Sequence, residues 1–172
     1  LSIAAVRQGL CDMRPSVTES RGRMNRFSLP NGATVLVDFA HNPDGVRQVG
    51  RTSQAWSAKR RVWLVGQAGD RTDADLELLA QAVAAHQPDF VLLKHMSKYR
   101  RGRPVGEVVQ RIREGLLASG VSPDCIADVA SEGDGVAWMI ANARPEDVML
   151  MLVQEDLDDA LARLAAAGAK GE

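Results

Sequence analysis

The alternation of short apolar runs with longer amphipathic segments constrains the fold of this chain most strongly. From residue 33 onward the apolar runs have the length of strands, and the segments between them repeat apolar residues at helical spacing. We expect strands at residues 33–38, 61–65, 90–94, 125–129 and 147–153, each followed by a helix. Five such units predict an α/β fold: a Rossmann-like, mostly parallel sheet with helices on both faces.

A short β-hairpin is predicted ahead of these units. A strand at residues 26–29 meets the strand at 33–38 through a turn at 30–32, whose sequence is Pro-Asn-Gly. Residues 1–10 carry one apolar stripe and predict the end of a helix, and 11–20 have the mixed polarity of a linker. Because the chain begins at a leucine, we expect residues 1–20 to be the tail of a preceding domain with its linker, and 21–172 to be the α/β domain.

Composition excludes several classes of function. The net charge is −1 and both signs are interspersed, which argues against a nucleic-acid partner and against binding at a membrane surface. The longest apolar run, at 148–153, is too short to span a bilayer, and no secretory signal opens the chain. Cys11 and Cys125 lack the spacing of a disulfide framework or a zinc site. A cytoplasmic protein fits these features best.

Residues 35–45 place polar side chains directly after a strand. In open α/β sheets, ligands bind at the carboxyl ends of the strands. Asp38 and His41 have the chemistry to hold a ribose hydroxyl, an adenine edge or a metal-bound water. Asn42 and Pro43 suit the cap and first position of a helix. The same residues would equally suit an ordinary strand-to-helix turn, so the pattern alone leaves both interpretations open.

The sequence Gly69-Asp70-Arg71 follows the next strand and belongs to the same edge of the predicted sheet. Its glycine permits a close backbone approach, and its arginine offers a bidentate fork to a phosphate. The alternative is a plain turn, or a contact between Asp70 and Arg71 within the loop.

A cationic loop follows the strand at 90–94. It is either a solvated charged loop or a site that attracts an acidic ligand such as a carboxylate or phosphate. The residues that give it this character are Lys94, Lys98, Tyr99, Arg100, Arg101 and Arg103.

Other chemistries lack support in the sequence. No G-x-G-x-x-G follows the first parallel strand and no G-x-x-x-x-G-K-[ST] loop occurs anywhere. No serine or cysteine has a nucleophile-elbow context, and His95 has no metal-ligand spacing around it. We therefore assign no catalytic and no metal-binding residue. His86 is expected at a helix end or on the surface, and the three tryptophans in the core.

Three segments together resemble the carboxy-terminal domain of the Mur ligase superfamily, which includes muramyl-peptide ligases, folylpolyglutamate synthetases and cyanophycin synthetases. They are Arg21-Gly22-Arg23-Met24-Asn25, Val37-Asp38-Phe39-Ala40-His41-Asn42-Pro43-Asp44-Gly45 and Gly69-Asp70-Arg71. Two more, at residues 101–108 and 143–147, resemble cyanophycin synthetases most, with Glu146 in place of a glycine. Phe39 stands where a tyrosine is more usual.

The resemblance implies a role in ATP-dependent amide-bond formation, in which a carboxylate is activated as an acyl phosphate and then attacked by an amine. The residues that it places on the nucleotide are Arg23, Asp38, His41, Asn42 and Pro43. Those that it places near the incoming amino acid or the carboxylates of the peptide or polypeptide acceptor are Asp70, Arg71, Arg100, Arg101 and Arg103.

In the superfamily, the phosphate-binding loop, the Mg²⁺ ligands and a modified lysine belong to a preceding central ATPase domain. None of these occurs in this sequence. We therefore expect ATP and Mg²⁺ to act in a full-length parent, and this chain alone to be inactive and to bind no cofactor firmly. Two alternatives stay open: a stand-alone nucleotide- or amino-acid-binding module, and a non-catalytic interaction domain.

Overall fold

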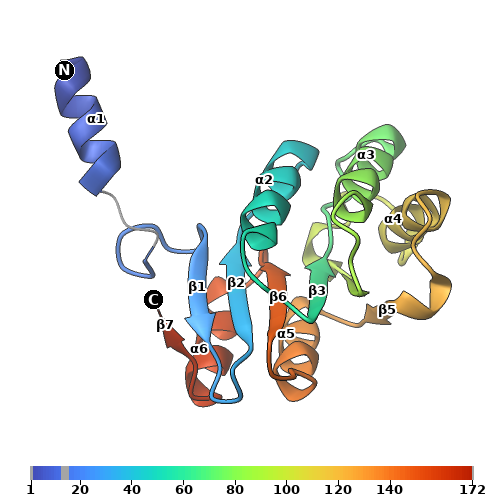
Figure 1. The fold of residues 1–172 in the computed structure, drawn as a ribbon. Coiled ribbons are helices and arrows are strands. Elements are labelled where there is room, and N and C mark those ends of the chain that lie inside the picture. Colours follow the sequence, from blue (N-terminus) through green and yellow to red (C-terminus); the bar gives the residue numbers. More distant parts are fainter. Residues whose placement is uncertain (1, 13–15, 172) are drawn as a thin grey trace.

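The computed structural model describes residues 2–12 and 16–171, whose strands form one sheet with helices on both faces (Figure 1). The strands lie in the order β5-β4-β3-β6-β2-β1-β7. Those from β5 to β2 are parallel, and β1 pairs antiparallel with both β2 and β7. The predicted α/β fold with its leading hairpin is confirmed. The strand bounds are β1 Asn25–Ser28, β2 Thr34–Asp38, β3 Arg60–Val65, β4 Phe90–Lys94, β5 Ile126–Val129, β6 Asp147–Leu152 and β7 Lys170–Gly171.

The last parallel strand, β6, occupies the centre of the sheet. It pairs with β2 on one side and with β3 on the other, and all of its residues are buried. Its continuous apolar sequence suits a strand covered on both faces. Because β2 and β3 flank β6, the loops that follow these three strands meet at one edge.

The helices divide into two layers, each with its own core (Figure 1). The first cluster contains side chains of α2, α3 and α4, and the second contains side chains of α5 and α6. The bounds are α2 Pro43–Gln54, α3 Asp73–Ala84, α4 Glu107–Ala118, α5 Glu132–Ala141 and α6 Leu157–Ala166. Within the described chain, every helix lacks the length and apolar character that a bilayer span requires.

Local capping explains where several helices begin. Asn42 caps α2, as predicted: its Oδ1 accepts the Gly45 amide at 2.8 Å, and Pro43 takes the first helical position. Thr72 and Asp75, at the three-residue spacing that predicts a capping box, form one reciprocally at the start of α3. Ser131 and Asp156 cap α5 and α6.

The two ends of the chain differ from expectation. The helix predicted at residues 1–10 is α1 (Ile3–Asp12), which continues two residues into the expected linker. The rest of that linker includes residues 13–15, which lie outside the described residues. The two-residue strand β7 was not predicted, because only its pairing with Phe27 and Ser28 of β1 identifies it as a strand.

Two predictions of burial were wrong. The apolar spacing of residues 105, 108, 109, 112 and 116 predicts that Val105 lies on the buried face of a helix. Instead, Val105 precedes α4 and is 76% exposed, because Gly106 adopts a left-handed conformation (φ 82°) that cannot continue the helix backward. His86 follows the end of α3, as expected, but it is buried rather than on the surface, and its ring stacks on Trp63 with the centroids 6.0 Å apart. Of the tryptophans, Trp63 is fully buried, whereas Trp56 and Trp138 are partly buried.

Candidate functional site

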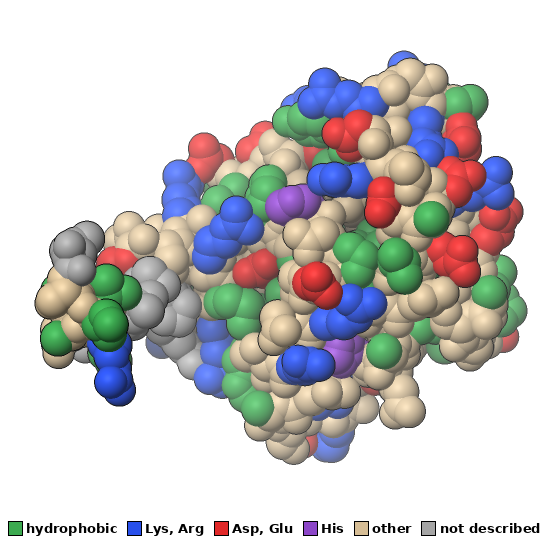
Figure 2. Space-filling model, turned by 90° about the horizontal axis from the view of Figure 1, so that it is seen from above, with side chains coloured by type: hydrophobic (Ala, Val, Ile, Leu, Met, Phe, Trp, Pro, Cys, Tyr) green, Lys and Arg blue, Asp and Glu red, His purple; other side chains and the backbone are tan. Residues whose placement is uncertain are grey.

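The carboxyl ends of β2, β3, β4 and β6 point to the same edge of the sheet, at the top of Figure 1. The loops that leave them are residues 39–42, 66–72, 95–106 and 153–156. Figure 2 shows this edge from above, with basic side chains beside histidine and exposed hydrophobic groups. Every residue that the sequence assigned to a site lies on one of these loops, at the end of β2, at the start of α2 or in the segment that precedes β1.

Asp38 at the end of β2 is buried and ties two backbone segments together. Its Oδ2 accepts the Met24 amide at 2.8 Å, and its Oδ1 accepts the Ala40 amide at 2.7 Å. Met24 has a left-handed backbone (φ 54°), so the segment containing Arg23 turns sharply just before β1. The visible role of Asp38 is thus to hold Arg23 close to the strand end, and its contact with a nucleotide stays a prediction.

Arg23 and His41 both contact the ring of Phe39. The Arg23 guanidinium carbon lies 4.7 Å from the Phe39 ring centroid, in the range of a cation–π contact. The His41 ring meets the other aromatic ring edge-on, with centroids 5.3 Å apart. Phe39 is 37% exposed, so this group of side chains stands at the surface with its cation available to an anion. Phe39 therefore orients two of the predicted nucleotide residues.

The Gly69-Asp70-Arg71 loop lies directly against the cationic loop. The Gly69 amide donates to Tyr99 O at 2.8 Å, and a Cβ added to Gly69 would lie 1.9 Å from Arg100 O. The close backbone approach that this glycine permits is therefore to a neighbouring loop. Asp70 Oδ1 and Arg71 Nε are 4.0 Å apart, and both side chains are partly exposed.

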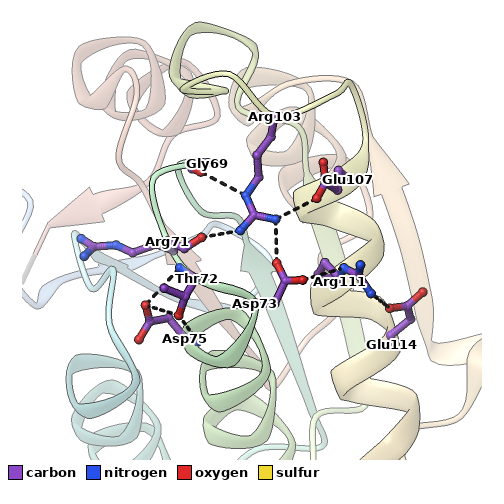
Figure 3. A network of polar contacts seen from close by, with 9 residues as sticks. All are labelled: Gly69, Arg71, Thr72, Asp73, Asp75, Arg103, Glu107, Arg111 and Glu114. Atoms are coloured by element: carbon purple, nitrogen blue, oxygen red, sulfur yellow. Dashed lines mark hydrogen bonds and ion pairs between the residues drawn. The ribbon is translucent and has the colours of Figure 1, made fainter.

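Arg103 joins these two loops to α3 and α4 (Figure 3). Its Nε donates to Gly69 O at 3.1 Å and its Nη2 to Arg71 O at 2.5 Å, while Nη1 reaches Asp73 Oδ1 at 2.7 Å and Glu107 Oε1 at 2.9 Å. The Asp73 carboxylate raises the pKa of Arg103, and Arg103 in turn lowers the pKa of Asp73. The donors of Arg103 face these internal acceptors, whereas Arg100 and Arg101 are exposed.

Two adjoining hollows lie at this edge of the sheet. One, of about 280 Å³, is lined by His41 together with Asp70 and Arg71, so the predicted nucleotide and substrate groups meet there. The other, of about 260 Å³, is lined mainly by the cationic loop and includes Arg100. Gln67 and Met96 line both hollows and form the wall between them. The other predicted nucleotide residues, Arg23, Asp38, Asn42 and Pro43, do not line the first hollow.

Residues 22–152 match the family described as "Mur ligase, glutamate ligase domain". The chain belongs to the Mur ligase family. Cyanophycin synthetase of Nostoc sp. (strain PCC 7120) is 39% identical over 124 residues, which are 72% of this chain and 13% of that protein. The 2,6-diaminopimelate-adding muramoyl ligase of Pseudomonas aeruginosa is 31% identical over 137 residues, 80% of this chain and 27% of that protein. The chain thus spans a minor part of the length of these relatives.

Solved structures agree on the fold. A UDP-N-acetylmuramoyl-L-alanyl-D-glutamate–2,6-diaminopimelate ligase superposes with a TM-score of 0.63 at 19% identity over 96% of this chain and 37% of that chain. Escherichia coli FolC in complex with DHPP and ADP gives a TM-score of 0.64 at 19% identity over 96% of this chain and 35% of that chain. The predicted resemblance to a Mur ligase C-terminal domain, with cyanophycin synthetases among its relatives, is therefore confirmed.

One feature of this Mur ligase domain was misinterpreted from sequence. Lys94 was grouped with the cations of the solvated loop, but it is 1% exposed and pairs with Glu132, which is also buried. Burial alone would raise the pKa of Glu132, but Lys94 and backbone amides stabilise the carboxylate and lower that pKa below its usual value. The available signal was that Lys94 ends the apolar run Phe-Val-Leu-Leu-Lys, where a side chain falls inside the sheet.

Proposed function

We propose that this Mur ligase domain is the C-terminal domain, residues 21–172, of an ATP-dependent acid–amino acid ligase of the cyanophycin synthetase type. In this proposal the domain closes over ATP and positions the incoming amino acid. The observation that carries it is the hollow of about 280 Å³ in which His41 meets Asp70 and Arg71. The names of the relatives support it, because they are a cyanophycin synthetase and a diaminopimelate-adding ligase. The ADP bound in the FolC complex supports the proposal that the ligand is an adenine nucleotide.

The side chains at this edge suit two anionic ligands. Arg23 is exposed above Phe39, where it would meet phosphate oxygens, and His41 and the Asn42 amide would face the ribose or base. Arg71, Arg100 and Arg101 would hold carboxylates of the amino acid or acceptor. Arg103 would act indirectly, by holding the Arg71 loop in place.

The chemistry needs a second domain. Activation transfers a phosphoryl group from ATP to a carboxylate, and the amine then displaces phosphate to form the amide. Among residues 2–12 and 16–171, no group of three or more His, Cys, Asp or Glu side chains is arranged to hold a metal ion. By the resemblance to the family, we assign Mg²⁺ and the phosphate-binding loop to a preceding central domain of the parent. Closure of the two domains would exclude water and align the amine with the acyl phosphate.

Phosphate release that depends on an added amino acid tests this proposal. The full-length parent is assayed with each of the twenty amino acids, beside the 172-residue chain alone. We expect turnover from the parent and none above background from the isolated chain. In the parent, Arg71→Met should lower turnover at least tenfold, while Arg144→Met, an arginine just before β6, should leave it unchanged.

Two results would overturn the proposal. Turnover by the isolated chain would show that the domain carries its own catalytic groups. Tight binding of ATP or an amino acid by the isolated chain, measured calorimetrically, together with an inactive parent, would favour a stand-alone binding module.

A further inference from the structure

The buried side chain of Lys94 crosses the end of a neighbouring strand. Because β3 lies between β4 and β6, Lys94 must pass β3 to reach Leu152 O at the end of β6, to which its Nζ donates at 2.5 Å. Gly66 follows β3 at the crossing point, and a Cβ there would lie 2.5 Å from Lys94 Cγ. The absence of a side chain at Gly66 thus makes room for Lys94.

Glu132, at the start of α5, receives Lys94 and holds the loop after β6. Besides the Lys94 ammonium, its carboxylate accepts the backbone amides of Gln154, Glu155 and Asp156 at 2.7 to 3.1 Å. A carboxylate with so many donors in a buried place has little freedom to move. The pair therefore fixes the backbone of residues 154–156.

Two glutamine side chains hold the turn after β2, and one of them, Gln154, belongs to the segment that Glu132 fixes. Gln154 Nε2 donates to Ala40 O at 2.7 Å, and Gln67 Nε2 donates to His41 O at 2.5 Å. These two carbonyls lie between the end of β2 and the Asn42 cap of α2, where neither the sheet nor the helix supplies a donor. Gln67 and Gln154 both line the hollow that contains His41.

We propose that Gln67, Gln154 and the Lys94–Glu132 pair are positioning residues that set the place of His41 in the nucleotide site. Lys94 and Glu132 act through Gln154, while Gln67 acts directly from the loop after β3. The pair thereby connects the strand that leads into the cationic loop with the turn that carries His41. This inference rests on the proposed function for its purpose, but the connection itself exists without nucleotide.

A double-mutant cycle on the 172-residue chain, followed by NMR without nucleotide, tests the connection. The variants are Gln154→Leu, Lys94→Met and the two together. The readouts are the amide shift of His41 and the hydrogen-exchange rates of the Gly45 and Val46 amides. Those two amides bond to Asn42, immediately after the turn. Loss of one hydrogen bond to the turn should raise these rates about three- to tenfold.

The outcomes separate positioning from general stability. We expect each single variant to shift the His41 signal and raise the exchange rates, and Lys94→Met to add little in the Gln154→Leu background. The same substitution at exposed Lys98 serves as the control and should leave both readouts unchanged. A lower melting temperature with unchanged His41 and Gly45 signals would overturn the proposal, as would full additivity. If Lys94→Met does not fold, Gly66→Ala, which displaces the Lys94 stem, takes its place in the cycle.

An ADP titration of the same samples tests the purpose separately. ADP should shift the His41 signal of the unmodified chain, and Gln154→Leu should weaken this binding at least threefold. The proposed nucleotide site fails if ADP at about 10 mM, which would occupy even a site with a Kd of about 1 mM, shifts nothing at His41. The coupling measured without ADP is judged separately. If ADP binds both proteins equally, the positioning role is wrong and the nucleotide site is retained.

Discussion

Lys94 ends strand β4, and Arg103 lies in the loop that follows it. Both pair with a carboxylate, yet their surroundings differ. The Lys94 side chain is fully buried, and its partner Glu132 is 3% exposed. The Arg103 side chain is 17% exposed, and its partner Asp73 is 55% exposed. Removing Lys94 would leave a carboxylate buried without its cation, whereas removing Arg103 would leave partners that water can reach. The exposure of the cation thus separates the two roles: buried Lys94 supports the fold, whereas partly exposed Arg103 holds two loops together.

The largest expected effect comes from Lys94→Met. It should lower the free energy of unfolding by about 3–5 kcal/mol, because one partner of a buried ion pair is lost. Urea denaturation measures this change, with Lys98→Met as a control that should stay within about 0.5 kcal/mol of the unmodified protein. A loss below about 1 kcal/mol would mean that the backbone amides around Glu132 suffice to stabilise it, which would remove the contrast with Arg103.

A smaller effect is expected for Arg103→Met. The free energy of unfolding should fall by about 1–2 kcal/mol. This loss is smaller than for Lys94→Met, because water can reach several of the acceptors that Arg103 leaves. In parallel, the pKa of Asp73 should rise toward its ordinary value, since the hydrogen bond from Arg103 is the largest cause of its lowering. NMR titration of the Asp73 carboxyl follows this change. The control is Arg101→Met, whose exposed side chain lies in the same loop and should alter neither quantity.

His86 sharpens the comparison because it is buried without a paired carboxylate. Burial lowers its pKa below 6.5, and the nearby positive charge of Arg51 adds to this. The unfolded chain then binds a proton that the folded chain does not, so stability should be complete above about pH 6.5 and fall as the pH drops below that value. Urea denaturation between about pH 7.5 and 5.5 measures the slope. His86→Phe, which keeps a ring on Trp63, should remove it, and an unchanged slope in that variant would assign it to another group.

The smallest expected effect concerns Phe39. Phe39→Ala should cost about 0.5–1 kcal/mol, because it removes an exposed cation–π contact with Arg23. Under the proposed function, the same change in the full-length parent should raise the KM for ATP more than it lowers kcat, since the arginine loses its orientation. Phe39→Tyr retains the ring and should behave as the unmodified protein. If Phe39→Ala has the same KM for ATP as the unmodified protein, the contacts of Phe39 with Arg23 and His41 play no part in binding.

The candidate site was predictable where it depended on motifs at the ends of strands. His41, Asp70 and Arg71 follow two different strands, and the alternation of strands and helices alone placed them on one edge; the structure puts them around one hollow. Gln67 and Gln154 could not be identified, because a glutamine beside a loop has the same local pattern whether it faces water or holds a distant carbonyl. Gln154 lies 114 residues from the Ala40 carbonyl that it reaches.

The sequence by itself determined the hairpin, the parallel strands and the helices, the capping by Asn42 and Thr72, and the motifs of the Mur ligase family. These depend on side-chain periodicity and on contacts within about four residues, which a linear pattern contains. Only the tertiary structure decided that β6 enters between β2 and β3, that Lys94 is buried on Glu132, and that Arg103 braces loops about 30 residues away. The reason is that strand order sets which distant side chains meet, and no local pattern identifies a partner such as Glu132, which lies 38 residues from Lys94.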